Sequence, residues 1–313
     1  MPDHTAPFSP DLPALLKGVS RSFYLSIRLL PAGLRRPVAI AYLLARTSDT
    51  LADAPGIAAQ DRIAALDLFM ASIQGTAPPR PFDAGSDATP AERRLLAAFP
   101  TCMRELEHIP AVDRGEVFTV LGHIVAGQRL DIERFGVAGT QAQALTPDEL
   151  DQYTYLVAGS VGEFWTRLGF RHVDNFASLP QGEMCELGRR YGMALQLVNV
   201  LRDRGEDLAN GRAYVHGDDA PWFERASAGL DCARRYCMAV GNARVRVASA
   251  LPAILGARTL TLLREAGPAA LSHRVKVPRG AVRAIALRLA LTLGGRAQLE
   301  REFRAALCDN RAQ

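Results

Sequence analysis

The stretch "ALQLVNVLRDRGEDLANGR", residues 194–212, carries two aspartates one helical turn apart in an otherwise apolar helix. Asp203 and Asp207 stand at positions i and i+4, where like charges on an exposed helix repel by roughly 0.2–0.5 kcal/mol. Burial without a partner would raise that cost. A helical wheel places both in one narrow stripe, which also contains Gly192, Gln196 and Asn199. The stripe faces a ligand or is the exposed side of an amphipathic helix, and the wide apolar arc around it favours the ligand.

A second stretch, "VAIAYLLARTSDTLAD" at residues 38–53, repeats the pattern. Tyr42, Arg46, Asp49 and Asp53 share one face of the helix that its periodicity predicts. One acidic i,i+4 pair is a weak signal, because such pairs are common by chance. Two pairs on largely apolar helices, each beside an arginine, are a much stronger indication of a site.

Carboxylate groups without a set of cysteines and histidines indicate Mg²⁺ rather than zinc. Mg²⁺ typically takes one or two carboxylates together with water and substrate phosphate oxygens. Arginines in or beside the acidic motifs would bind the anion. The sequence therefore predicts a site for a diphosphate held by Mg²⁺ and by guanidinium groups from Arg21, Arg46, Arg202 and Arg212.

A third segment, "YTYLVAGSVGEFWTRLG" at residues 153–169, places several small residues on one helical face. Glycine inside a helix costs roughly 0.5–1 kcal/mol relative to alanine, so the stripe needs an explanation. Close packing of two helices and room for a long apolar substrate are equally good explanations. Gln128 and Asp131 in "GQRLDIERF" are further candidates for lining a cavity, or a solvated polar face.

Helical periodicity dominates the 313-residue chain, and alternating β-branched runs are missing. We expect an all-α fold with a single domain spanning residues 1–313, because nothing resembles a linker or a repeat. The Rossmann and P-loop glycine motifs are absent. Helices are predicted near residues 11–30, 35–54, 58–73, 91–107, 112–134, 148–170, 181–208, 221–249, 251–266 and 279–306.

The bulk properties describe an ordinary globular protein with 48% hydrophobic residues and a net charge of +4. This charge is too small to indicate nucleic-acid binding. Five cysteines without a CxxC pair fit reduced thiols in the cytoplasm. We expect no signal peptide and no apolar run near the roughly 20 residues that span a bilayer.

Four segments together resemble the squalene/phytoene synthase family, the head-to-head trans-prenyl transferases, and most closely its bacterial squalene synthases. These segments occur in the family's order and are "SRSFYLSIRLLP" (20–31), "ARTSDTLAD" (45–53), "YTYLVAGSVG" (153–162) and "QLVNVLRDRGEDLANGRAY" (196–214). The resemblance implies an isoprenoid-synthase helical bundle, with both acidic motifs facing each other across a central cavity.

The resemblance also implies roles for individual residues. The metal ligands would be Asp49, Asp53, Asp203 and Asp207. The residues that bind the substrate diphosphate would be Ser20, Arg21, Arg46, Arg202, Arg212 and Asn199. The residues at the reaction centre would be Tyr42, Tyr155, Arg46, Gln196 and Asn199.

The implied reaction ionises one allylic diphosphate and adds the double bond of a second prenyl diphosphate to the cation. Loss of a proton then gives presqualene diphosphate or a longer analogue, with Tyr155 or the released diphosphate as the base. Squalene synthases next reduce this intermediate with NADPH, whereas phytoene synthases need no reductant. "SHRVKVPRGAV", residues 272–282, resembles the squalene synthase segment near the NADPH phosphates, or is a basic surface helix start.

Lys276 is the matching NADPH position in that segment, with Asn199 as a second candidate. Leu156 departs from the tyrosine that animal squalene synthases have there.

We expect farnesyl diphosphate as substrate and squalene as product. The alternatives are phytoene or dehydrosqualene synthesis without reductant, a half-reaction enzyme that stops at presqualene diphosphate, a class I terpene cyclase, and a non-catalytic isoprenoid-binding protein. Because substrate and product are lipids, we also expect peripheral contact with the inner face of the membrane.

Overall fold

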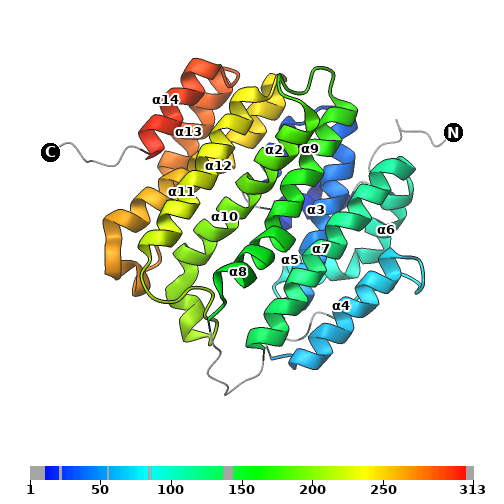
Figure 1. The fold of residues 1–313 in the computed structure, drawn as a ribbon. Coiled ribbons are helices and arrows are strands. Elements are labelled where there is room, and N and C mark those ends of the chain that lie inside the picture. The colour runs from blue at the N-terminus through cyan, green and yellow to red at the C-terminus, as the bar shows by residue number, and fades with distance from the viewer. Residues whose placement is uncertain are drawn as a thin grey trace. The chain divides into compact units, whose positions relative to one another are not determined.

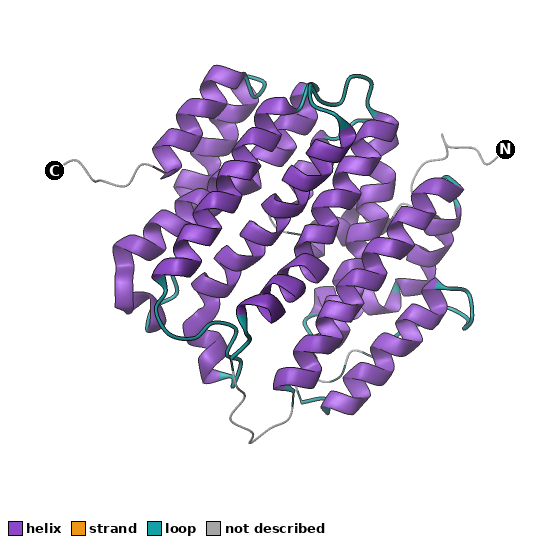
Figure 2. Ribbon diagram, viewed as in Figure 1, coloured by secondary structure: helices purple, strands orange, loops and turns teal. Residues whose placement is uncertain are grey.

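The computed structural model describes residues 11–20, 23–54, 56–83, 85, 87–136 and 144–307. Within these residues the chain is helical and contains no strand, apart from one isolated bridge between Ala177 and Val240 (Figures 1 and 2). The predicted all-α class is therefore confirmed. The contacts divide the chain into two compact units. Unit 1 contains Met1–Arg28 and Ala32–Ala138, and unit 2 contains Leu29–Pro31 and Gly139–Gln313.

Unit 1 is organised around the pairing of α3 with α7, and both of these helices also pack against α4 and α6. Its core includes three aromatic rings, Phe69, Phe82 and Phe99, whose centroids lie 5.1–6.5 Å apart. The helices of this unit are α1 (Asp11–Val19), α2 (Phe23–Leu29, whose last residue belongs to unit 2), α3 (Ala32–Ala52), α4 (Ala59–Ile73), α5 (Pro90–Ala97), α6 (Phe99–Glu107) and α7 (Ala111–Phe135).

Unit 2 is organised around α10, which packs against α8, α9, α11 and α12. The helix α10 is therefore in the interior of this unit, as the apolar arc of its sequence predicts. The elements of unit 2 are α8 (Pro147–Thr154), the π-helix η1 (Tyr155–Gly159), α9 (Ser160–His172), α10 (Gln181–Ala209), α11 (Ala220–Ala239), α12 (Ala243–Ala266), the 3₁₀ helix η2 (Gly267–Leu271), α13 (Arg279–Leu291) and α14 (Arg296–Leu307).

Several predicted helices are shorter than expected, and at one of the breaks a capping side chain starts the next helix. The prediction for 221–249 runs through a break at Val240–Asn242, where the Asn242 side chain accepts hydrogen bonds from Arg244 N and Val245 N and starts α12. Conversely, Pro252 does not break a helix but lies inside α12. Breaks also divide the predicted helices at 11–30, 91–107 and 279–306, whereas the prediction for 148–170 corresponds to a continuous helical segment with a π-helical turn at Tyr155–Gly159.

One apolar stretch, Ala243–Leu271, meets the length and composition of a membrane span among the described residues. No such stretch was predicted from the sequence, in which this region was divided between predicted helices at 221–249 and 251–266. In the structure, 78% of its apolar window is buried, and α12 packs against α10, α11, α13 and α14. A buried core helix meets the same criteria, so this stretch is weak support for membrane insertion.

Arg246 connects α12 to the segments on either side of it. Its Nε donates to Gly294 O at 2.7 Å, and its Nη1 donates to Val240 O at 2.7 Å and Gly241 O at 3.1 Å. Replacing it with methionine keeps most of the side-chain volume but leaves these carbonyls without a donor. We expect Arg246→Met to reduce the free energy of unfolding by about 2–4 kcal/mol, measured by urea denaturation.

The exposed Arg244 provides the matched control, because its side chain makes none of these bonds. Arg244→Met should change the free energy of unfolding by less than about 0.5 kcal/mol. Equal effects of the two substitutions would show that the three hydrogen bonds make no measurable contribution to the free energy of unfolding.

Candidate functional site

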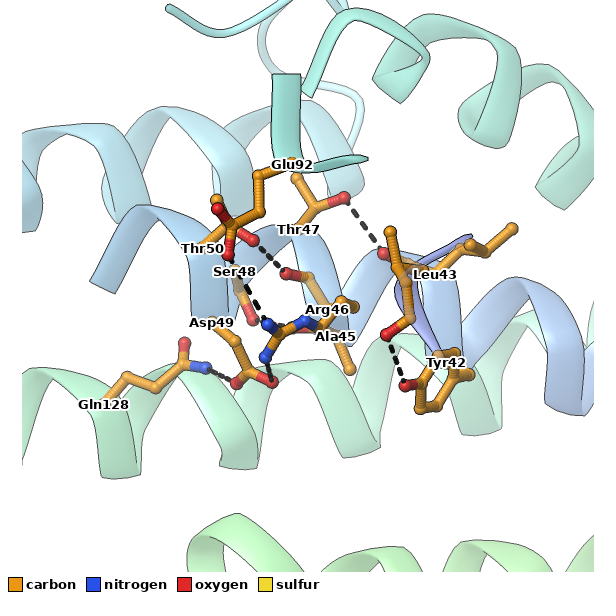
Figure 3. Close-up of polar contacts among 11 residues, drawn as sticks. Tyr42, Leu43, Ala45, Arg46, Thr47, Ser48, Asp49, Thr50, Glu92 and Gln128 are labelled. Atoms are coloured by element: carbon orange, nitrogen blue, oxygen red, sulfur yellow. Dashed lines mark hydrogen bonds and ion pairs between the residues drawn. The ribbon is translucent and has the colours of Figure 1, made fainter. Parts of the chain in front are cut away.

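The first acidic motif lies on the C-terminal half of α3 in unit 1. Asp49 Oδ1 accepts a hydrogen bond of 2.6 Å from Nε2 of Gln128 on α7, and Asp49 Oδ2 lies 3.8 Å from Arg46 Nη1 (Figure 3). Gln128 is buried, and its Oε1 has no hydrogen-bond partner among the residues that the structure describes. A carboxylate and an unsatisfied amide oxygen are thus held side by side by two packed helices.

The environment of Asp49 disfavours its negative charge. Burial raises its pKa to about 6; Arg46 opposes this shift, whereas the neighbouring Asp53 adds to it. The Asp49 side chain still has 42% of its surface exposed, so solvent and ions reach it. A hard cation would relieve the unfavourable charge, and the oxygen-rich donor set of Asp49, Asp53 and Gln128 fits such a cation.

The raised pKa gives a pH-dependent prediction for the metal-free protein. The folded state binds the Asp49 proton more tightly than the unfolded state, whose pKa is near 3.8. The ionised carboxylate therefore destabilises the fold above about pH 6, by an amount that solvent reduces because 42% of the side chain is exposed, and this penalty disappears as the pH falls toward 3.8. Asp49→Asn should raise the melting temperature at pH 7.5 in EDTA, and the gain should shrink toward pH 4.5.

Asp174→Asn is the control, since Asp174 is an exposed carboxylate outside this cluster. Its substitution should not reproduce the pH-dependent gain. A lower melting temperature for Asp49→Asn at pH 7.5, or a difference that does not change with pH, would contradict the assignment.

Arg46 lies between two carboxylates. Besides Asp49, its guanidinium approaches Glu92 of α5 at 3.6 Å (Figure 3). Glu92 forms a capping box with Thr89, and these hydrogen bonds are the main cause of its lowered pKa. Glu92 was not identified from the sequence, although its T-x-x-E spacing marks the capping box.

Tyr42, on the helix of the first acidic motif, contacts Val19 and Ser20 at the start of the predicted segment 20–31. Its hydroxyl donates to Val19 O at 3.4 Å (Figure 3), and Ser20 is near enough to affect its pKa. Burial raises the pKa of the Tyr42 phenol. Ser20 is itself buried and donates from Oγ to Leu16 O at 2.6 Å. Arg21, the remaining anion-binding candidate of this segment, lies outside the described residues.

In unit 2, two predicted residues of α10, Asn199 and Gln196, form a chain of hydrogen bonds with Tyr153, here called the polar ladder. Asn199 Nδ2 donates to Gln196 Oε1, and Gln196 Nε2 donates to the Tyr153 hydroxyl, both at 3.4 Å. Tyr153 also stacks on Tyr214, with ring centroids 5.2 Å apart. Tyr153 was not predicted from the sequence, because it lies outside the small-residue face that contains Tyr155.

Asp203 forms ion pairs with two arginines. Arg202 donates to both of its carboxylate oxygens, with Nε at 3.0 Å and Nη2 at 2.5 Å. Arg274 Nη2 lies 3.3 Å from Asp203 Oδ1, and Arg274 Nη1 lies 3.5 Å from Glu206 Oε2. Arg274 was missed, although it belongs to the basic segment that the sequence singled out.

The other candidates of unit 2 lie around this ladder. Tyr155 begins η1, which packs on α10, and burial raises its pKa. Asp207 is half-buried near the end of α10, and its carbonyl accepts from Arg212 N at 2.8 Å. Lys276 is exposed between η2 and α13. The role proposed for each of these residues stays a prediction.

The small-residue stripe is explained by close helix packing. A Cβ atom at Gly162 of α9 would lie 1.9 Å from Gly188 O, and one at Gly192 would lie 2.1 Å from Ala158 O. Space for a substrate is therefore not needed to account for these glycines. The π-helix at Tyr155–Gly159 lies at the same contact, and such helices are frequent at functional sites.

Among the described residues, no group of three or more His, Cys, Asp or Glu side chains is close enough to hold a metal by itself. Each acidic motif supplies two aspartates, which fits Mg²⁺ bound jointly by protein and substrate oxygens. The two motifs belong to different units, and their facing each other across a cavity stays a prediction.

Comparisons with known proteins agree with these motifs. A family model described as squalene/phytoene synthase matches residues 16–219. A 15-cis-phytoene synthase of Synechocystis sp. is 33% identical over 212 residues, covering 65% of this chain and 54% of that protein. A squalene synthase of Eremothecium gossypii is 29% identical over 235 residues, covering 70% and 50%. The chain thus spans about half the length of these relatives.

A solved structure of TcSQS with the ligand E5700 matches with a TM-score of 0.74 at 19% identity, covering 95% of this chain and 97% of that one. At this identity the likeness shows the fold. The predicted isoprenoid-synthase helical fold is confirmed.

Proposed function

Because the chain belongs to the squalene/phytoene synthase family, we propose that it joins two molecules of farnesyl diphosphate head to head in an Mg²⁺-dependent reaction. The first product is presqualene diphosphate, which is then reduced to squalene with NADPH. The observation that carries the proposal is the cluster of Asp49, Arg46 and Gln128, in which a carboxylate with a pKa of about 6 stands beside a cation and an unsatisfied amide oxygen.

The acidic residues hold the metal and the arginines bind the diphosphate. Asp49 and Asp53 in unit 1, with Asp203 and Asp207 in unit 2, are the proposed Mg²⁺ ligands. When bound, Mg²⁺ stabilises the departing diphosphate. Arg46 and Arg202 each already lie against a carboxylate, so substrate binding exchanges this ion pair for one with diphosphate. Ser20, Arg21, Arg212 and Asn199 complete the proposed diphosphate contacts.

The two tyrosines act as hydrogen-bond donors in this proposal. Burial raises the pKa of both Tyr42 and Tyr155 above the ordinary value of 10. Both phenols are therefore protonated at neutral pH, and a protonated phenol is a poor acceptor of the proton lost from the carbocation. We assign that proton to the released diphosphate. Gln196 holds its place in the ladder through Tyr153 and Asn199.

The NADPH step depends on the basic segment after η2. Residues 267–298 contain no aspartate or glutamate, and the exposed Lys276 has no ion pair with a described residue. An unpaired cation in an acid-free segment fits a nucleotide phosphate. Lys276, with Asn199, is the proposed contact to NADPH.

A second candidate is condensation without a reductant, giving phytoene from geranylgeranyl diphosphate or dehydrosqualene from farnesyl diphosphate. The phytoene synthase relative is 33% identical, slightly more than the squalene synthase relative at 29%. This observation favours a reductant-free product. We propose a cytoplasmic location in either case.

The test is incubation of the purified protein with each prenyl diphosphate and Mg²⁺, with and without NADPH, followed by mass analysis. Squalene formed only with NADPH supports the first proposal. Phytoene or dehydrosqualene formed equally with and without NADPH supports the second. Presqualene diphosphate alone would mean a half-reaction enzyme, and cyclic products of one substrate molecule would mean a terpene cyclase. No diphosphate release from either substrate would overturn the enzymatic proposal.

A further inference from the structure

The helix α13 exposes leucines that the fold does not use. It buries only Ile285 and Leu289 in its contacts with α12 and α14 (Figure 1). On its other side Leu287 and Leu291 are 59% and 75% exposed, and Leu293 just after the helix is 67% exposed. Three of the eight large hydrophobic side chains that are exposed in the described part of the chain thus lie within seven residues.

Unpaired cations lie on the same side of α13. Arg279, Arg283, Leu287 and Leu291 follow one another at intervals of four, so they form a single row along the helix, here called the α13 row. Arg279 and Arg283 are exposed, and neither has a hydrogen bond or ion pair with any described residue. The row therefore has a cationic N-terminal half and an apolar C-terminal half.

The surrounding sequence provides no negative charge to balance the row. From Gly267 to Gln298 the chain contains no aspartate or glutamate. The nearest paired arginine on α13 is Arg288, which is held by Glu302 of α14 on the other side of the helix. The two arginines of the α13 row are thus left for an external anion.

We propose that the α13 row docks on an anionic lipid bilayer. Lipid phosphates would bind Arg279 and Arg283, while Leu287, Leu291 and Leu293 would enter the boundary between headgroups and acyl chains. A helix with cations and exposed leucines on one face and a packed opposite face is typical of interfacial binding.

Charge favours a lipid surface over a second copy of the chain. A two-fold dimer through the row would bring two sets of Arg279 and Arg283 near one another, with no acidic residue in the segment to pair them. An anionic bilayer provides both the negative charge and the apolar phase. The proposal does not rest on the proposed enzymatic function, because it uses neither Lys276 nor Arg274.

The experiment is cosedimentation of the full chain with vesicles of phosphatidylcholine alone or with 30% phosphatidylglycerol. Arg279→Gln/Arg283→Gln should weaken binding to the anionic vesicles roughly 30-fold. Each surface cation increases the affinity about fivefold, and the effects of the two arginines multiply. Leu287→Ser/Leu291→Ser should weaken it about tenfold or more. These leucines are exposed, so their replacement leaves the core unchanged. High salt should reduce binding of the wild type.

Two matched double variants serve as controls. Arg235→Gln/Arg244→Gln removes two exposed arginines from α11 and α12, and Leu68→Ser/Val112→Ser removes two exposed apolar side chains from unit 1. Both should bind anionic vesicles within about twofold of the wild type. The proposal is overturned if a control variant loses as much binding as its test variant, or if neither test variant changes binding. It is also overturned if the leucine variant converts a dimer to a monomer while vesicle binding is unchanged.

Discussion

Asp203→Asn or Asp49→Asn should lower kcat/KM for the prenyl diphosphate by about 10³-fold or more, roughly 4 kcal/mol of transition-state stabilisation. Each substitution removes one of the proposed charged oxygen ligands from an acidic motif while keeping the shape of the side chain. The Asp203→Asn substitution also removes the charge-assisted hydrogen bonds that Arg202 donates to the carboxylate. The measurement is steady-state kinetics over a range of Mg²⁺ concentrations, since a weakened metal site should also need more Mg²⁺.

Glu206→Gln is the matched control on the same helix. Glu206 is exposed, shares Arg274 with Asp203, and loses the same charge on substitution. We expect its kcat/KM to stay within a few-fold of the wild type. If the aspartate variants keep wild-type activity and Mg²⁺ dependence, the assignment of the metal ligands is wrong. If Glu206→Gln loses as much activity, the effect comes from the general charge at the end of α10.

Gly192→Ala should cost about 3 kcal/mol of the free energy of unfolding, despite alanine's better helix propensity. The new Cβ atom would lie 2.1 Å from Ala158 O and 2.7 Å from Ala158 C, both of which are backbone atoms. Backbone of the π-helix cannot move aside as a flexible side chain does, so η1 must separate from α10. Urea denaturation followed by circular dichroism measures the loss.

Gly182→Ala tests the same substitution on the same helix without the contact. No heavy atom lies within 4 Å of a Cβ at Gly182. This variant should be unchanged or more stable by up to about 1 kcal/mol. A Gly192→Ala protein as stable as Gly182→Ala would mean that η1 and α10 do not pack as closely as described.

Sequence periodicity was enough to predict the helices and the positions of both acidic motifs. The hydrophobic pattern of residues 194–209 depends only on neighbours within a few turns, and α10 is buried as predicted. Helix boundaries were less predictable. A helix was predicted to begin at residue 251, yet α12 begins at Ala243, where the side chain of Asn242 caps it, and it continues through Pro252.

The partners of the site residues could not be predicted in the same way. Glu92 beside Arg46 and Tyr153 beneath Gln196 come from helices whose packing is set by contacts far apart in the sequence. Arg274 pairs with Asp203 although the two residues are 71 positions apart in the sequence. No local pattern connects such residues.

The sequence by itself determined an all-α chain with two D-x-x-x-D motifs beside arginines, because helix periodicity and residue chemistry are local properties. The tertiary structure decided how those charges are paired within the protein. Arg202 and Arg274 neutralise Asp203, whereas Asp49 is left with a pKa of about 6 beside Gln128. It also decided that the glycine stripe serves helix packing, because desolvation, ion pairing and steric contact depend on which distant segments meet.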